Sequence, residues 1–484
     1  MPALTLAARE GRSRVVEDQI FHMKLALRKY SARRCPASRL PVELWDMIFE
    51  ECVFSRAAEP NVTEAPLNVS QVCRRWRSIA LSNPVLWATF ALSTTERHTQ
   101  SDRALQSIHK ICQLWLLRAE NRPLSVSLTQ AEGFCCDNDS GVGPISLLLD
   151  DVLSYSTRLR QLSVRAPEVC LFPLESPNLY LPVLEHLKIE SPWHSRVAPD
   201  LIMSADMAPR LRRVSILQTS FDTAHIGLDY TQLTHLTLVP APTAPAHVFW
   251  AADDALTFLT EAPLIQVIHL AINDFTPIRR TLAQSDSLLS LSLEFRDALS
   301  GAPRRFLRIG AFFSLLYTPN LRHLSLCDRG AADRVLWPMQ QYLIKWPQDQ
   351  FLAYLRSTQL RALALEHLPL YETQVIECLQ QVPKLVELVL EALPHTGSQR
   401  NVGDILLGAL TSWNVPPNGV PIAPALRSLE FRHCGKRCTE QALILMVDSR
   451  KGVLKYLRVH RSTLPSRELA ECMALWNVAV DVYY

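Results

Sequence analysis

The residues whose types could support chemistry are few and scattered. His433, Cys434 and Cys438 form the group that comes closest to a metal site. A zinc site needs four ligands that usually include a second closing pair, and no such pair stands at a suitable spacing. The sequence therefore favours packing of Cys434 in a turn over metal ligation, and it predicts neither a metal nor a cofactor.

Patterns typical of catalytic and nucleotide-binding loops are also missing. Gly141-Val142-Gly143 lacks the third glycine of a dinucleotide fingerprint and follows no clear strand. Cys135 and Cys136 stand in a polar stretch, where we expect free thiols. The chain has no P-loop and no G-x-S-x-G elbow. We predict a non-catalytic protein and keep an enzyme as a third hypothesis.

Composition narrows the function classes further. The chain has 484 residues and a net charge of +3, which is too mild to predict nucleic-acid binding. No apolar run reaches the length of about 18 residues that a membrane span requires, so no membrane partner is expected. Its 12 cysteines follow no disulfide framework, so we expect reduced thiols and a cytoplasmic and/or nuclear location. The length indicates two or three units or a repeat array.

The elements that must position any binding residues begin with an amphipathic helix over residues 13–30. Its seam consists of Val16, Ile20, Met23, Leu27 and Tyr30. Two heptads are too short for a stable coiled coil, so residues 1–35 are predicted to pack on the same chain as a monomer, with a dimer seam as the alternative.

Two further helices are predicted over residues 36–92. The first spans about 41–53 and carries Leu40, Leu44, Ile48 and Cys52 as an i, i+4 stripe. The second spans about 67–82. One face of this second helix is predicted to be apolar, formed by Val69, Val72, Cys73, Trp76, Ile79 and Ala80.

One apolar pattern recurs through residues 100–484, after a helix predicted at 102–119 and a strand at 124–128. The pattern is apolar-x-x-apolar-x-apolar, and its copies start 22 to 41 residues apart. Its eleven first positions are Leu159, Leu184, Leu211, Leu233, Ile265, Leu288, Leu321, Leu360, Leu385, Leu426 and Leu454. Six copies have proline two residues earlier, where it would end a helix and extend the chain into a strand. This period predicts a solenoid with parallel strands on one face and helices on the other.

The residues between the core positions of each strand are predicted to face an open surface. Its early part is basic and carries histidines, and the part from Glu294 to Glu430 is predicted to be acidic. The candidate target-binding residues on it are His186, Lys188, Arg213, His235, Glu294 and His323. A shared metal among the histidines is disfavoured, because the strand of Arg213 would separate His186 from His235 by roughly 10 Å.

Two family resemblances follow from these motifs. The recurring pattern resembles irregular leucine-rich repeats. The runs Leu40-Pro41 with Ile48-Phe49, Val72-Cys73-Arg74-Arg75-Trp76 and Leu86-Trp87 resemble the F-box family, and the whole layout resembles the fungal F-box set. The fold class implied is α/β, with an N-terminal helical F-box followed by a leucine-rich-repeat solenoid.

The F-box resemblance implies the function of a substrate-recognition adaptor. Such an adaptor binds the Skp component of a Skp–cullin–F-box ubiquitin ligase and holds an unknown target protein on its repeats. The residues carried over as Skp contacts are Leu40, Pro41, Leu44, Ile48, Val72, Cys73 and Trp76. Trp76 and Trp87 have internal packing as an alternative role.

The alternative is a non-catalytic repeat scaffold whose F-box-like segment only caps the solenoid. Exposure separates the two hypotheses. Burial of Leu40, Leu44 and Ile48 within the chain would favour the scaffold, and an exposed apolar patch at these residues would favour docking.

Overall fold

The computed structural model describes residues 23, 39–53, 58–95, 101–131, 143–192, 199–221, 223, 226–241, 244, 248–274, 282–295, 305–329, 346–391, 402–411, 421–432, 438–460 and 479–483. The helix predicted over 13–30, except Met23, and the residues Cys135, Cys136, His433 and Cys434 lie outside this set. The chain divides into two compact units, Met1–Ala91 with Leu114–Arg122, and Leu92–Gln113 with Pro123–Tyr484.

The first unit is helical. Its elements are α2 (Val42–Val53), α3 (Leu67–Val72), α4 (Arg74–Ser82) and the 3-10 helix η2 (Pro84–Trp87), with parts of β1 (Thr89–Thr94) and α6 (Asp102–Arg118). The helix predicted over about 41–53 is confirmed by α2. The single helix predicted over 67–82 is wrong, because the backbone is extended at Cys73 and separates α3 from α4.

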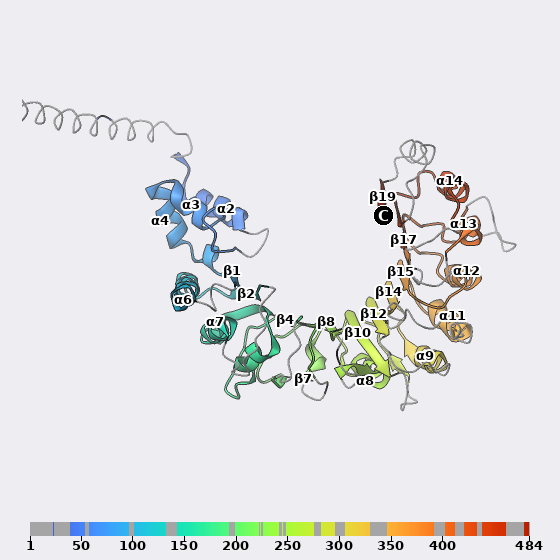
Figure 1. Ribbon diagram of the computed structural model, residues 1–484, viewed down its shortest axis with the longest axis horizontal. Coiled ribbons are helices and arrows are strands. Elements are labelled where there is room, and N and C mark those ends of the chain that lie inside the picture. The colour runs from blue at the N-terminus through green and yellow to red at the C-terminus, as the bar shows by residue number, and fades with distance from the viewer. Residues whose placement is uncertain are drawn as a thin grey trace, which may run out of the picture. The chain divides into compact units, whose positions relative to one another are not determined.

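The second unit is built on a large parallel sheet whose strands follow the order of the chain (Figure 1). These strands are β2 (Leu124–Gln130), β3 (Leu159–Arg165), β4 (His186–Glu190), β6 (Arg213–Leu217), β8 (His235–Val239), β10 (Val267–Asp274), β12 (Ser290–Phe295), β14 (His323–Asp328), β15 (Ala362–Glu366), β16 (Glu387–Glu391), β17 (Ser428–Arg432), β18 (Tyr456–His460) and β19 (Ala479–Tyr483). β9 (Trp250–Ala251) pairs with β10. Two short pairs, β5 (Leu201–Met203) with β7 (Ile226–Leu228) and β11 (Ala283–Gln284) with β13 (Leu316–Tyr317), lie apart from this sheet.

The strand register confirms the alignment of the recurring pattern. The second apolar position of each copy is paired with the second apolar position of the next, as in Leu162 with Leu187 and Leu388 with Leu429. The paired set is Leu162, Leu187, Val214, Leu236, Ile268, Leu291, Leu324, Leu363, Leu388, Leu429 and Leu457, and all of its members are buried. The core is therefore a continuous stack of aliphatic rows.

Helices connect many but not all of these strands. They are α7 (Pro144–Leu153), α8 (Ala252–Glu261), α9 (Arg305–Ser314), α11 (Gln348–Arg356), α12 (Glu372–Gln381), α13 (Asp404–Leu410) and α14 (Glu440–Ser449), and Figure 1 shows them along one side of the sheet. Between β3 and β8 the described connections contain instead the 3-10 helices η4 (Glu168–Glu175) and η6 (Tyr230–Gln232) with β5 and β7, and η3 (Ser156–Arg158) precedes β3. In the part of the chain that the structure describes, no helix combines the length and apolar character needed to cross a bilayer.

The six recurring prolines occupy one position in a tight turn. At Pro383, the carbonyl of Val382 accepts a hydrogen bond from the N–H of Leu385, the first apolar position of that copy. The same bond recurs before Leu184, Leu211, Ile265, Leu321 and Leu426. Proline therefore stands at the second residue of a four-residue turn, where its fixed φ is favourable. The role predicted for it, ending a helix, applies where α8 and α12 precede such turns.

Candidate functional site

Helix α2 carries two apolar faces. Trp45 and Phe49 are 5% and 1% exposed and lie on one face with Val53. Leu44 and Ile48 are each 43% exposed, and Met47 is 62% exposed. A short surface helix normally buries one apolar stripe and exposes polar residues opposite. The second stripe of α2 is instead apolar and exposed, which is typical of a surface that binds a partner.

An aromatic cluster holds the buried face of α2 against α4. The ring of Trp76 lies 4.5 Å from the ring of Trp45 and 5.2 Å from that of Phe49, measured between centroids. Trp76 is half-buried, so its ring is part of the interior of this unit. This placement agrees with the internal role kept as an alternative for Trp76.

The break between α3 and α4 exposes residues that a continuous helix would have placed on one apolar face. Val72, the last residue of α3, is exposed, and so is Cys73. The Cys73 sulfur accepts a hydrogen bond from the Trp76 N–H over 3.5 Å and so caps α4. The single apolar face predicted for this segment is therefore wrong in part. Val69, Ile79 and Ala80 are buried as expected, whereas Val72 and Cys73 are exposed.

Polar side chains fix how these helices pack. The Arg75 guanidinium donates to the Leu40 carbonyl over 2.7 Å. The Asn83 amide donates to the carboxylates of Asp46 and Glu50, each over 3.1 Å. These bonds join α2 to the two ends of α4, so the exposed stripe is presented by a helix of fixed position.

Trp87 lies in the core of the first unit. It is fully buried, its indole N–H donates to the Ala80 carbonyl over 2.8 Å, and its ring lies 5.0 Å from that of Trp115. The Arg118 guanidinium lies 4.3 Å from the centre of the Trp87 ring as a cation–π contact. The internal role considered for Trp87 from the sequence is confirmed.

The residues predicted to contact a Skp adaptor therefore differ in how exposed their side chains are. Pro41, Leu44, Ile48, Val72 and Cys73 are exposed, Leu40 and Trp76 are half-buried, and Trp76 is engaged by the aromatic cluster. The burial that would have favoured a purely structural cap is absent at Leu44 and Ile48.

The comparisons with known proteins point to the same segment. A family model described as F-box-like matches residues 37–93. This match supports the interpretation of the chain as an F-box protein. A search of curated proteins gave no match to the chain.

The second candidate surface is the open face of the sheet in the second unit. His186, Arg213 and His235 lie in register on β4, β6 and β8, and β6 separates the two histidines as predicted. Partial burial and the positive charge of Arg213 lower the pKa of both histidines. Lys188 pairs with Glu190 over 3.3 Å. Both shifts favour the neutral imidazoles, and Arg213 is the cation that lies between them.

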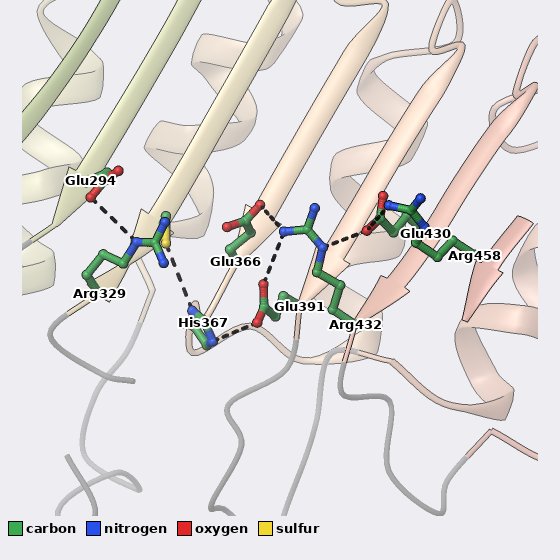
Figure 2. Close-up of polar contacts among 9 residues, drawn as sticks. Glu294, Arg329, Glu366, His367, Glu391, Glu430, Arg432 and Arg458 are labelled. Carbon is green, nitrogen blue, oxygen red and sulfur yellow. Dashed lines mark hydrogen bonds and ion pairs between the residues drawn. The ribbon is translucent and has the colours of Figure 1, made fainter. Parts of the chain in front are cut away.

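The later part of the open face differs from the acidic surface predicted. Arginines neutralise most of its carboxylates in an ion-pair network along β12 and β14–β18 (Figure 2). Arg432 contacts Glu430, Glu366 and Glu391 at 2.7, 3.1 and 3.5 Å. Arg329 lies 3.5 Å from Glu294, and Arg458 lies 3.5 Å from Glu430.

Glu294 and His323, the two remaining candidates, are placed differently. Glu294 is 7% exposed and is contacted by Arg329 and by His269 at 3.2 Å, so its carboxylate is engaged within the sheet rather than open as predicted. His323 is exposed at the start of β14.

A chain of contacts in this network has the residue types of a nucleophilic site. Cys327 lies 4.0 Å from Nδ1 of His367, and Nε2 of His367 lies 3.1 Å from Glu391. A thiol must ionise to act as a nucleophile. Burial, followed by smaller effects of Glu366 and Glu294, raises the pKa of the Cys327 thiol far above its ordinary value, although the charge of Arg329 opposes this. Burial thus favours the protonated thiol over the thiolate that a nucleophile requires.

Sequence reasoning missed a row of cations on this sheet. Arg322, Arg361, Arg427 and Lys455 each follow the first apolar position of a repeat copy, at Leu321, Leu360, Leu426 and Leu454. All four are exposed. This fixed offset from the recurring pattern was the signal that could have revealed them. The four residues are called the basic row below.

Proposed function

We propose that this protein is a substrate-recognition adaptor of a Skp–cullin–F-box ubiquitin ligase. The observation that carries the proposal is the exposed apolar stripe of α2, Leu44, Met47 and Ile48, inside the segment that matches the F-box-like family model. F-box domains generally bind Skp-type adaptors. An exposed helical stripe with this spacing suits insertion into the apolar groove of such a partner.

The second unit supplies the other half of the proposal. Its in-register parallel strands, recurring turns and flanking helices support an irregular leucine-rich-repeat solenoid of the kind found in fungal F-box proteins. The open strand face would hold the target protein. The adaptor would be monomeric outside the ligase complex, in the cytoplasm and/or the nucleus.

The proposed mechanism needs no catalytic residue in this chain. Binding the Skp component and the target at the same time turns the encounter of the target with a ubiquitin-conjugating enzyme into a step within one complex. The effective concentration of the target then rises without any new chemical group. The bond-making steps belong to other subunits of the ligase.

The exposure of Leu44 and Ile48 also weighs against the repeat-scaffold alternative. A segment that only caps the solenoid would bury both side chains, because exposed apolar surface gains nothing in a purely structural cap.

The deciding experiment is a pull-down of a purified Skp-type adaptor by the purified chain. We expect the wild type to bind and Leu44→Asp to lose at least about ten-fold in affinity, because a charge would be buried in an apolar groove. Leu445→Asp on α14 is the matched control, since Leu445 is 44% exposed on a helix of the second unit. Absence of binding by the wild type would refute the proposal, as would equal binding by Leu44→Asp.

A further inference from the structure

The basic row runs across five neighbouring strands of the sheet, β14 to β18, with one gap. Each member immediately precedes a strand: Arg322 precedes β14, Arg361 precedes β15, Arg427 precedes β17 and Lys455 precedes β18. Val386 holds the same position before β16. Backbone bonds link these positions directly, since the N–H groups of Arg361, Val386, Arg427 and Lys455 donate to the carbonyls of Arg322, Arg361, Val386 and Arg427 over 2.7, 2.7, 2.8 and 2.8 Å.

The side chains of the row have no partners within the described part of the chain. None of the four makes an ion pair or a side-chain hydrogen bond there, and all are exposed. Arginines further along the same strands behave differently, because Arg432 at the end of β17 and Arg458 in the middle of β18 are held by glutamates. The arginines further along these strands are therefore neutralised by carboxylates. The residues just before the strands present positive charge that has no partner among the described residues.

The gap at Val386 does not interrupt this charge. Lys384 stands two residues earlier in the same strand connection, is exposed, and also has no partner within the described residues. The acid beside the row is Glu387, the first residue of β16, which is paired in register with Ala362 and Ser428. Among the described residues, the last residues of the connections leading into the five strands β14 to β18 thus carry five cations, and Glu387 lies beside them.

The dimensions of the row suit a short extended peptide. Neighbouring strands lie about 4.8 Å apart, so the four steps from Arg322 to Lys455 span roughly 19 Å. An extended chain rises about 3.3 Å per residue and covers that length with about six residues. The backbone ladder fixes the spacing of the cations, so little order remains to be imposed when a ligand binds.

We propose that the basic row binds an acidic segment of a partner protein, about six residues long. This inference rests on the proposed function in that the partner would be the target protein delivered to the ligase. A peptide is favoured over a nucleic acid because the row is one residue wide, Glu387 adjoins it, and the strands that follow the row carry the glutamates of the ion-pair network. Nucleic-acid sites present a broader basic surface.

Fluorescence anisotropy with a labelled peptide tests the proposal. The probe is a peptide of about eight residues in which glutamate and serine alternate, added to the purified chain without any Skp adaptor. The variant Arg361→Glu/Arg427→Glu reverses two charges of the row. The matched control is Arg103→Glu/Lys110→Glu, which makes the same change in net charge at exposed positions on α6.

We expect the row variant to bind the peptide at least about ten-fold more weakly than the wild type, and the α6 variant to stay within about two-fold. Thermal unfolding of both variants checks that the fold is intact. Equal weakening in the two variants, or no binding by the wild type, would overturn the proposal. Tighter binding of a single-stranded oligonucleotide or of anionic lipid vesicles than of the peptide would overturn it too. Since no Skp adaptor is present, these outcomes are independent of the pull-down that tests the adaptor function.

Discussion

At the scale of single residues, Glu168 is a carboxylic acid in an apolar place. Its side chain is fully buried, and one carboxyl oxygen accepts a hydrogen bond from the N–H of Ser220. The other oxygen has no hydrogen-bond partner within the described part of the chain. Burial raises the pKa of Glu168 to about 7, although the bonds from Ser220 oppose the shift. The neutral acid is therefore the form that this site favours.

The raised pKa of Glu168 makes stability depend on pH. The folded state binds the proton more tightly than the unfolded state, whose pKa is near 4.5. The stabilising effect is complete below pH 4.5 and is lost as the pH rises through about 7. The wild type should therefore lose unfolding free energy as the pH rises from 4.5 to 8, whereas Glu168→Gln should not. The unfolding free energy of Glu168→Gln should rise by roughly 3 kcal/mol relative to that of the wild type over this range. Urea unfolding at pH 5 and pH 8 measures this gain, and an equal difference at both values would contradict it.

At the scale of elements, Arg450 joins three segments that are far apart in sequence. It follows α14 and is buried. Its guanidinium donates to the carbonyls of Leu410, Ile422 and Ala423 over 2.6, 2.7 and 2.8 Å. Burial lowers the pKa of Arg450 to about 10, so it remains charged at neutral pH. A buried charge is stable here because its donors are met by the end of α13 and by the turn before β17.

Replacing Arg450 should be costly. Arg450→Met removes the guanidinium donors from three buried carbonyls, and of these the Ala423 carbonyl keeps its bond from the Leu426 N–H. The carbonyls of Leu410 and Ile422 lose the guanidinium, so we expect a loss of about 3–5 kcal/mol in unfolding free energy. Lys451→Met is the control, because Lys451 is exposed and its ion pair with Asp448 lies on the surface. That variant should change stability by less than about 0.5 kcal/mol. Thermal unfolding followed by circular dichroism compares the two, and similar midpoints would show that Arg450 does not act as a link.

The strands could be predicted from sequence and the polar contacts could not, for identifiable reasons. Aliphatic spacing placed the core rows, because periodicity alone determines which side chains face inward. The break at Cys73 was missed, since Val72 and Trp76 keep helical spacing across it. The contacts of Arg432 with Glu366 and Glu391 join residues 66 and 41 positions apart, and no local pattern encodes such pairs. On α2, apolar spacing indicated the exposed stripe but not that Trp45 and Phe49 would form the buried one.

At the scale of the whole second unit, the sheet is a linear stack. β15 is paired with β14 and β16, and each later strand likewise has its neighbours in the chain beside it. Stability in such an array comes from the strands themselves and from the interfaces between adjacent ones. A local defect should therefore weaken its neighbours most.

The stack predicts a graded response to damage at β15. Leu363 is 1% exposed in the middle of the core row, so Leu363→Ala should cost about 2–5 kcal/mol. Amide hydrogen exchange should quicken most in β14–β16 and progressively less towards β4 and β3. Ser325→Ala, on the open face, serves as the control. Equal acceleration in every strand would indicate a single cooperative unit instead of a stack.

The position of the basic row has a consequence for how such a protein could acquire new partners. Arg322, Arg361, Arg427 and Lys455 contribute backbone bonds to the fold, whereas their side chains support nothing within the described residues. Substitutions there should be nearly neutral for stability. Recognition and folding are thus encoded at separate positions of the same repeat. A library varied at these four positions alone would change what the surface selects while leaving the aliphatic rows beneath it unchanged.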